Sequence, residues 1–333
     1  MDLNIIWFFL IGVLLIGYAI LDGFDLGVGI LQLFCKKENE KVELLKSIAP
    51  FWDGNEVWLL TGGGALFAAF PHAYASVFSG FYLAMMLLLV GLIFRALSIE
   101  FRDQVASYAW KHFWDKAFSV SSLVVALLLG VALGNVVVGI PLNSEMDYTG
   151  SFFTLLRPVP LLIGITGVFM MTLQGATYLQ LKTVGELYQK ANNWARFSWK
   201  AFVILLLILI VGVAFLYEGS LFYFVSKSQG YPVILLMIVS IWMTRRSLNK
   251  KYDMAAFLFS SGNIISMFLI VAVLLFPNIV NAIDPENSLT IYNASSSRLT
   301  LKTMLIIALI GMPIVIAYTT YIYRVFRFKK VYQ

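Results

Sequence analysis

Two carboxylates lie inside the first apolar stretch of the chain, where lipid is expected to surround them. Asp22 and Asp25 belong to the segment GYAILDGFDLGVG at positions 17–29. Their spacing of three residues places them on neighbouring parts of one helical face, and the glycines around them permit close approach of another helix. A carboxylate inside a membrane is energetically unfavourable unless it is paired, hydrated or protonated. Such residues usually mark functional sites. The segment therefore favours a proton or ion site over a structural contact between helices or helix-end charges reaching the headgroups, although both readings stay open.

A second pair of acids has the same spacing at the start of the next apolar stretch. Asp53 and Glu56 lie in PFWDGNEVW at positions 50–58. Proline at a helix start and acids in its first turn are ordinary N-terminal features, and Trp52 suits an interfacial aromatic belt. Taken alone, this pair fits a structural role as well as a functional one.

The elements that must position these acids are membrane helices. Of the 333 residues, 60% are hydrophobic and 13% are charged, and the mean hydropathy is +0.84. A soluble domain is closer to half apolar and a quarter charged. The single cysteine, Cys35, excludes an intrachain disulfide and a cysteine-based metal cluster. The first residues lack the basic start of a signal peptide, so we expect the first helix to be retained.

Apolar runs long enough to cross about 30 Å of hydrocarbon recur along the whole chain. The seventh run is short, and residues 221–225 are expected to extend it. Nine spans are predicted, at about 5–34, 50–70, 75–99, 117–140, 158–180, 200–217, 231–244, 254–277 and 303–325.

The distribution of basic residues supports nine spans and orients them. With nine spans, 19 Lys and Arg residues fall on one side of the membrane and 4 on the other, whereas deleting the seventh span gives 13 against 10. Because cytoplasmic loops carry the excess of basic residues, we expect the N-terminus outside and the C-terminus in the cytoplasm. The net charge of +6 is then a topology signal, and nucleic acid is not expected as a partner.

This topology brings the two acidic pairs to a similar depth at the cytoplasmic side. Arg95, near the cytoplasmic end of the third span, joins them. Arg95 could pair with one acid while burial favours the protonated form of another. Such a group suits proton collection from the cytoplasm, and it equally suits a static salt-bridge network.

The histidines argue against haem binding by this chain alone. His72 and His112 are the only two histidines, and both fall outside the predicted spans. A b-type haem in a membrane takes axial ligands at membrane depth, usually His or a His/Met pair, and the twelve methionines are more simply explained as apolar packing. No Walker A loop, Rossmann fingerprint or HExxH motif occurs. Redox chemistry would therefore belong to a partner.

Several ordered stretches of the chain closely resemble subunit II of cytochrome bd-type quinol oxidases. The resemblance covers nearly the entire chain and includes long segments. These are GYAILDGFDLGVG (17–29), APFWDGNEVWLLTGGGALFAAFPHAYA (49–75), FSGFYLAMMLLLVGLIFRALSIEFR (78–102), FWDKAF (113–118), GNVVVGIPLN (134–143), TLQGATYLQLKTVGEL (172–187) and NASSSRLTLKTM (293–304).

The resemblance implies an all-α membrane fold in a bacterial cytoplasmic membrane. It implies two four-helix bundles, residues 1–140 and 141–277, followed by an outer loop, a peripheral ninth helix and a cytoplasmic tail at 278–333. It also implies a heterodimer with subunit I, which would carry two haems b, one haem d and the quinol-oxidising loop. The complex would oxidise quinol and reduce oxygen to water, electrogenically and without proton pumping. A small single-helix accessory subunit and a structural quinone are further possibilities in this family.

The same resemblance ranks the candidate residues. Asp25 and Asp53 match positions of a proton route from the cytoplasm, and the match ranks Asp22 and Glu56 below them. For Glu56 a further reason is that some relatives have Gln at its position. No catalytic or metal-binding residue is expected in this chain. The residues that match positions important for assembly or haem retention are Arg95, Asp115, Trp52 and Asn55.

Two other hypotheses remain at this stage. The chain could be a purely stabilising subunit, in which case changes to these residues would damage assembly and haem content. It could also be an ion-coupled secondary transporter, but its intramembrane acids lie only in the first half and toward one face, which disfavours that class.

Overall fold

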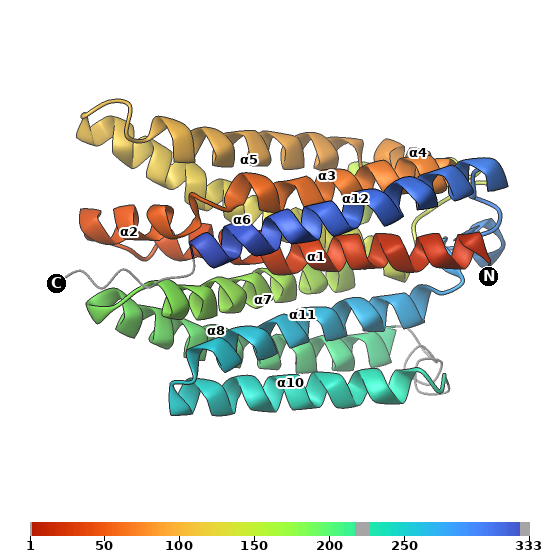
Figure 1. Ribbon diagram of the computed structural model, residues 1–333. Coiled ribbons are helices and arrows are strands. Elements are labelled where there is room, and N and C mark those ends of the chain that lie inside the picture. The colour runs from red at the N-terminus through yellow and green to blue at the C-terminus, as the bar shows by residue number, and fades with distance from the viewer. Residues whose placement is uncertain (1, 217–226, 327–333) are drawn as a thin grey trace.

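The computed structural model describes residues 2–216 and 227–326, which form a bundle of long, roughly antiparallel helices (Figure 1). The first helix begins and the last helix ends at opposite ends of this bundle. The elements are α1 (Leu3–Gln32), α2 (Glu38–Ile48), α3 (Trp52–Ala69), α4 (Pro71–Gly80), α5 (Tyr82–Phe101), α6 (Tyr108–Val138), η1 (Phe152–Leu155), α7 (Pro158–Lys182), α8 (Gly185–Leu216), α10 (Gly230–Lys250), α11 (Asp253–Leu275), β1 (Asn278–Val280), η2 (Pro285–Asn287), β2 (Leu289–Thr290) and α12 (Arg298–Val325).

The apolar helices confirm a multi-pass membrane protein. Within the described ranges, eight helices are long and apolar enough to span a bilayer: α1, α5, α6, α7, α8, α10, α11 and α12. The second predicted span corresponds to α3, which has 18 residues and is not among these eight. Its polar first turns, with Asp53, Asn55 and Glu56, lower its hydropathy. The total of nine spans therefore stays a prediction, and residues 221–225 lie outside the described part.

Several boundaries differ from those predicted. The third expected span is interrupted at Phe81, which separates α4 from α5. α6 and α8 begin at Tyr108 and Gly185, well before positions 117 and 200, because their polar first turns form ion pairs with neighbouring elements. The short helix α2 was not expected; it lies along the end of the bundle and buries Leu44, Leu45 and Ile48.

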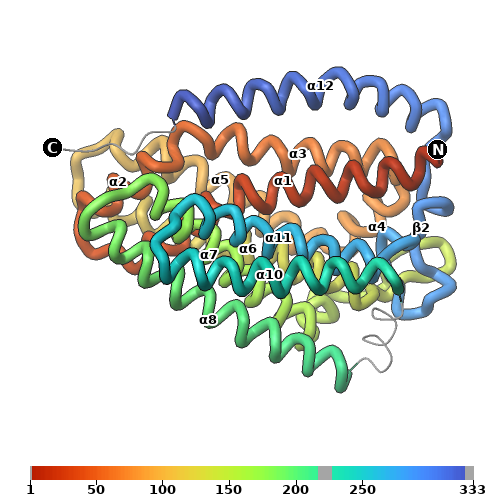
Figure 2. Tube along the Cα trace, turned by 60° about the horizontal axis from the view of Figure 1, so that its bottom comes forward, coloured from red at the N-terminus to blue at the C-terminus, as the bar shows by residue number. Residues whose placement is uncertain are grey.

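The long helices form two groups that share a broad contact. In the first group α1 packs against α3 and α6, and α5 packs against α6; in the second, α7, α8, α10 and α11 pack in pairs. α12 lies outside both and crosses α1 and α3, as Figure 2 shows. The predicted domain limits at 140 and 277 fall in loops. Because α1 and α6 both pack extensively on α7, division of the chain into separate units at those limits stays a prediction.

A small antiparallel sheet closes the end of the bundle opposite α2. In this sheet β1 pairs with β2, with Asn278 opposite Thr290 and Val280 opposite Leu289. Asn281 follows β1 and donates through its side chain to the carbonyl of Val137 at 2.8 Å. The loop thereby fastens the end of α6 to the segment that leads into α12.

The two groups meet most closely where α1 crosses α7. A Cβ built on Gly175 would lie 2.5 Å from the carbonyl carbon of Gly27, and one built on Gly27 would lie 2.0 Å from the carbonyl oxygen of Met171. The two backbones can be this close only because neither residue has a side chain. The expectation that the glycines near the first pair of acids serve close helix approach is confirmed at Gly27.

We therefore expect Gly175→Ala to separate α1 from α7 and to destabilise the protein by about 1–3 kcal/mol, the usual cost of overpacking. A thermal unfolding scan of the purified complex measures the change. Gly212→Ala is the matched control, because a Cβ on Gly212 in α8 meets nothing within 4 Å. Equal melting temperatures for the two variants would contradict the close crossing.

Candidate functional site

A buried ion pair joins α1 to α5 inside the bundle. Arg95 of α5 donates through Nη1 to Asp22 Oδ2 at 2.8 Å, and its Nη2 pairs with Asp22 Oδ1. Asp22, Asp25 and Arg95 are all completely buried. A guanidinium and a carboxylate joined by two parallel hydrogen bonds satisfy much of each other's hydrogen-bonding capacity and balance each other's charge. The ionised pair can therefore exist at this depth.

Asp25, one turn further along α1, is held differently. Its Oδ2 lies 3.8 Å from Arg95 Nη2 and accepts a hydrogen bond from Asn55 Nδ2 at 2.8 Å. Its Oδ1 is buried and has no hydrogen-bond partner in the described structure, and the same holds for the hydroxyl of Tyr18. Since buried polar atoms almost always have a partner, this side of Asp25 is suited to a water or a transferable proton.

The ninth predicted span also reaches this site. Tyr323 of α12 donates its hydroxyl proton to Asn55 Oδ1 at 2.9 Å. Asn55 in turn donates to Asp25, so a hydrogen-bonded chain runs from α12 through α3 to α1. We call Asp22, Asp25, Asn55, Arg95 and Tyr323 the intramembrane cluster.

The structure brings together some of the expected residues and leaves others outside. Arg95 contacts Asp22 and Asp25, but Asp53 lies on an exposed face of α3 and makes no hydrogen bond or ion pair in the described part of the chain. Glu56 and Trp52 are half-buried on the same helix. The second acidic pair is therefore at the edge of the intramembrane cluster and not inside it.

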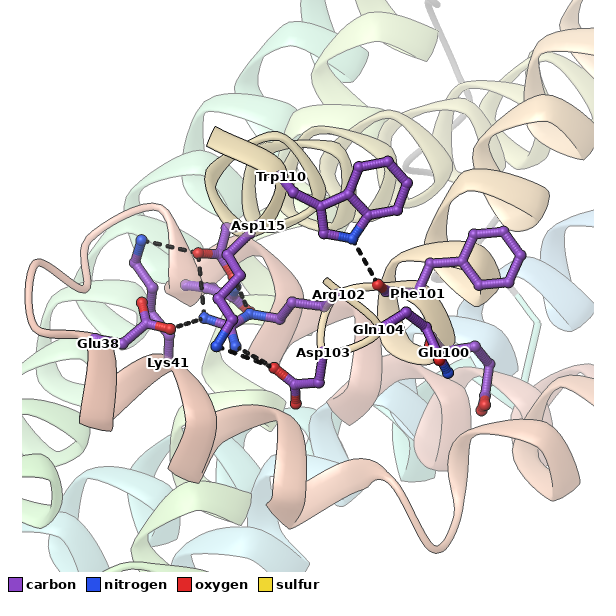
Figure 3. Close-up of polar contacts among 11 residues, drawn as sticks. Glu38, Lys41, Glu100, Phe101, Arg102, Asp103, Gln104, Trp110 and Asp115 are labelled. Atoms are coloured by element: carbon purple, nitrogen blue, oxygen red, sulfur yellow. Dashed lines mark hydrogen bonds and ion pairs between the residues drawn. The ribbon is translucent and has the colours of Figure 1, made fainter. Parts of the chain in front are cut away.

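A second polar group surrounds Arg102, just beyond the end of α5 (Figure 3). The Arg102 guanidinium is almost completely buried and donates from Nε to Asp115 Oδ1 at 2.6 Å. Its other nitrogens donate to Glu38 at 2.6 Å and to Asp103 at 2.9 Å. Asp115, near the start of α6, also accepts from Lys41 of α2 at 3.0 Å and from Gln32 at 2.8 Å. We call Gln32, Glu38, Lys41, Arg102, Asp103 and Asp115 the Arg102 cluster.

The Arg102 guanidinium keeps its charge at ordinary pH. Burial lowers the pKa of the Arg102 guanidinium, but hydrogen bonds to Asp115 and Glu38 outweigh it, and the pKa is raised above its usual value. The cluster ties α2 to the ends of α1, α5 and α6. Lys190 of α8 extends the same layer by pairing with Glu40 of α2 at 2.6 Å.

These contacts show that the basic loops share one end of the bundle. Lys37 of the first loop pairs with Glu186 at the start of α8, and Arg196 of α8 donates to Asn249 at the end of α10 at 3.1 Å. Lys182 at the end of α7 donates to the carbonyl of Phe326, just after α12. The charge count predicted this grouping. Three of the tail's basic residues, Arg327, Lys329 and Lys330, lie outside the described residues.

The sequence did not reveal the Arg102 cluster. Asp115 was singled out only by family resemblance, whereas Arg102, Lys41 and Lys190 were counted as loop charges. Apart from Asp103, which directly follows Arg102, the acids that partner them lie 13 to 150 residues away along the chain. Only the unexpected helix α2, folded back on the bundle end, brings these residues together. Tyr323 was missed for the same reason, since its partner Asn55 is 268 residues away.

The two histidines lie near the starts of helices, and the single cysteine is buried just after α1. His72 is exposed at the start of α4, and His112 is a half-buried residue that stacks on Tyr108 with ring centroids 5.7 Å apart. Burial raises the pKa of the Cys35 thiol to about 12, with the Glu40 charge adding to the effect, so the thiolate that would bind a metal is disfavoured. Within the described ranges, no three His, Cys, Asp or Glu residues gather as a metal site.

Two buried carboxylates held by an arginine and an asparagine, inside a bundle of apolar helices, define a polytopic membrane protein with a buried polar cluster. The family model described as cytochrome bd terminal oxidase subunit II matches residues 3–326. This chain belongs to that family. The family implies an oxidoreductase complex in the inner membrane that contains haem and pairs this subunit with a subunit I.

Individual relatives agree with this assignment. Cytochrome bd-I ubiquinol oxidase subunit 2 from Escherichia coli (strain K12) is 38% identical, over 96% of this chain and 93% of the relative. Cytochrome bd ubiquinol oxidase subunit 2 from Bacillus subtilis (strain 168) is 32% identical, over 98% and 96%. A chain in the structure of bd oxidase from Geobacillus thermodenitrificans superposes with a TM-score of 0.80 at 15% identity, over 99% of this chain and 100% of that chain. The last comparison confirms the fold.

Proposed function

We propose that this chain is the non-haem subunit of a quinol-oxidising bd oxidase, and that it supplies a scaffold and part of a proton uptake path. The matched relatives are named ubiquinol oxidase subunits, which supports quinol as the reductant. His72 is exposed and His112 lies near the start of α6, stacked on Tyr108, which supports placing the two haems b and the haem d in subunit I. Those haems would supply the oxygen-reducing chemistry.

The environment of Asp25 carries the proposal of a proton path. One carboxylate oxygen is fixed by Asn55, and the other is buried without a hydrogen-bond partner in the described part of the chain. Arg95 is committed to Asp22 through two hydrogen bonds and stands 3.8 Å from Asp25. Asp25 can therefore gain or lose a proton while Asp22 keeps its partner, and water can bridge such carboxylates into a relay.

Asp53 fits the outer step of this path. It lies in the first turn of α3, at the end of the bundle where the basic loops gather, and its side chain is exposed. With the N-terminus outside, as the distribution of basic residues favours, that end faces the cytoplasm. Protons consumed in making water would then enter from the cytoplasm, while quinol releases its protons on the other side. This arrangement generates a membrane potential without pumping.

Asp25→Asn tests the path in the assembled two-subunit oxidase. The amide can still accept from Asn55 but cannot carry a proton, so we expect quinol-driven oxygen uptake to fall by about tenfold or more, within the range of proton-transfer effects. The haem content, read from the visible spectrum, should stay at the parental level. Asp53→Asn should give a smaller loss of the same kind.

A purely stabilising subunit is the second candidate function, and the Asp22–Arg95 pair and the Arg102 cluster favour it. Under this alternative, Asp25→Asn would lower the haem content while leaving the rate per haem unchanged. Asp103→Asn is the matched control, because it removes an exposed carboxylate at the same end of the bundle. A parental rate per haem in the Asp25 variant would remove the proton role.

A further inference from the structure

A shallow pocket at the C-terminal end of α10 is lined by three basic residues. It has a volume of about 260 Å³ and is lined by Trp242, Arg245, Arg246, Asn249 and Lys250. Figure 1 shows that α10 ends at the same end of the bundle as α2. The pocket is remote in the fold from the intramembrane cluster, which lies on α1, α3, α5 and α12.

Aromatic rings, and not acids, hold the three cations of the pocket. The guanidinium of Arg245 lies 5.2 Å from the ring centroid of Trp199, and that of Arg246 lies 5.5 Å from the ring of Trp242. Lys250 Nζ lies 6.0 Å from the ring of Tyr252. Stacking of this kind orients a cation without neutralising it, so the pocket keeps its positive charge.

Several other cations at this end of the bundle are paired with acids. Arg102 and Lys41 contact Asp115, and Lys190 contacts Glu40, all within 3.0 Å. In the ranges that the structure describes, Arg245 and Arg246 form no ion pair with any carboxylate, nor does Lys250. Arg245 Nη1 is also buried without a hydrogen-bond partner. The pocket therefore offers positive charge and a hydrogen-bond donor to an anionic ligand.

An apolar stripe continues from the pocket along the lipid-facing side of α10. Leu235, Ile238 and Trp242 are exposed at helical spacing, and Arg246 follows one turn later on the same face. A ligand that matches this surface has an anionic group, which binds in the pocket, and a long apolar part, which lies along α10. Tryptophan at such a boundary is typical of the membrane interface.

Simple topology explains part of this charge but not its arrangement. Lys250 lies in the last turn of α10, where a cation complements the helix dipole, and basic residues on this side fit the positive-inside rule. Neither effect requires a pocket lined by Arg245, nor a buried Arg245 Nη1 that has no hydrogen-bond partner. Solvated charges for topology would project from the surface, as Lys36 and Lys251 do.

We infer that this pocket binds the phosphate headgroup of an anionic phospholipid, with the acyl chains lying along Leu235 and Ile238. Arg245 and Arg246 donate to the phosphate oxygens, Lys250 adds charge, and Trp242 lies at the level of the glycerol backbone. Clusters of basic residues at the end of a membrane helix are well suited to such headgroups. The inference rests on this geometry alone and holds for either orientation of the chain in the membrane.

The test uses the assembled oxidase in detergent, titrated with phosphatidylglycerol, cardiolipin or phosphatidylcholine and followed by native mass spectrometry. The parent should bind the two anionic lipids in preference to phosphatidylcholine. Arg246→Gln should weaken anionic lipid binding by about fivefold, and Arg245→Gln with Arg246→Gln by about tenfold or more, since each basic residue contributes to attraction of anionic lipid. Lys111→Gln is the matched control, because it removes one positive charge at the same end beside Asp103.

Three results would overturn the inference. Binding of phosphatidylcholine as strong as that of phosphatidylglycerol would show that the headgroup charge is not recognised. Arg246 is exposed, so its replacement leaves the packing of α10 intact. Unchanged anionic lipid binding in the Arg246 variant would therefore place the lipid elsewhere. Displacement of the lipid by low millimolar inorganic phosphate would assign the pocket to a free anion.

Discussion

Replacing Arg95 by Gln should prevent most of the protein from reaching a stable, haem-containing complex. The substitution leaves the Asp22 carboxylate buried without its two hydrogen bonds and removes the cation 3.8 Å from Asp25. Removing one partner of a buried ion pair costs about 3–5 kcal/mol, which is a large share of the stability of a typical protein. The amount of complex per membrane protein, read from its visible haem spectrum, measures the loss.

The double variant Arg95→Gln, Asp22→Asn separates charge balance from a direct role of the guanidinium. It removes both charges and lets two amides bond to each other, so we expect much of the lost assembly to return. Arg95→Lys should be intermediate, since an ammonium cannot make the two-pronged contact. A single Arg95→Gln variant that assembles within twofold of the parent would show that the pair contributes little.

The sequence predicted the membrane class and the strongest part of the site for a physical reason. Apolar runs that are long enough to span lipid have few alternatives to a helix, and an acid inside such a run stands out against its neighbours. Asp22, Asp25 and Arg95 could therefore be singled out from the sequence. The predicted direction of each helix then placed them at a similar depth in the membrane. The structure confirms that Arg95 contacts both acids.

Helix position alone could not predict which face of α3 turns inward. Asp53, Asn55 and Glu56 share one short segment, yet only Asn55 is buried, where it bonds to Asp25. The acids were the more conspicuous residues, but the neutral amide makes the contact. An amide can bridge a carboxylate and the Tyr323 hydroxyl without adding charge to a buried site, which a third acid could not do.

Contacts at the bundle end depend on how polar loops fold, and apolar periodicity says little about them. The loop after the first span was read as a run of topology charges, whereas it forms α2, an amphipathic helix with Leu44 and Ile48 completely buried. That helix supplies Glu38 and Lys41 to the Arg102 cluster. The importance of Asp115 at this end then rests on contacts in the structure as well as on family resemblance.

Asp115→Asn should destabilise the complex by about 3 kcal/mol, at the low end of the cost of breaking a buried ion pair. The carboxylate accepts from Arg102, Lys41 and Gln32 at once, so its loss leaves two cations facing each other. Because the pKa of Arg102 is raised above its usual value, changing the pH between 6 and 8 cannot remove its charge. The fall in melting temperature should therefore be the same at both pH values.

Asp103→Asn is the matched control for this prediction, because it tests an exposed carboxylate on the same guanidinium. Asp103 bonds to the same Arg102 guanidinium at 2.9 Å, but its side chain is 70% exposed, compared with 5% for Asp115. An exposed pair is worth about 0–1 kcal/mol, so the control should melt within a degree or two of the parent. If the two variants lose equal stability, burial does not determine the strength of this cluster. If only Asp115 matters, the cluster is a buried fastening that holds α2 across the ends of α1, α5 and α6.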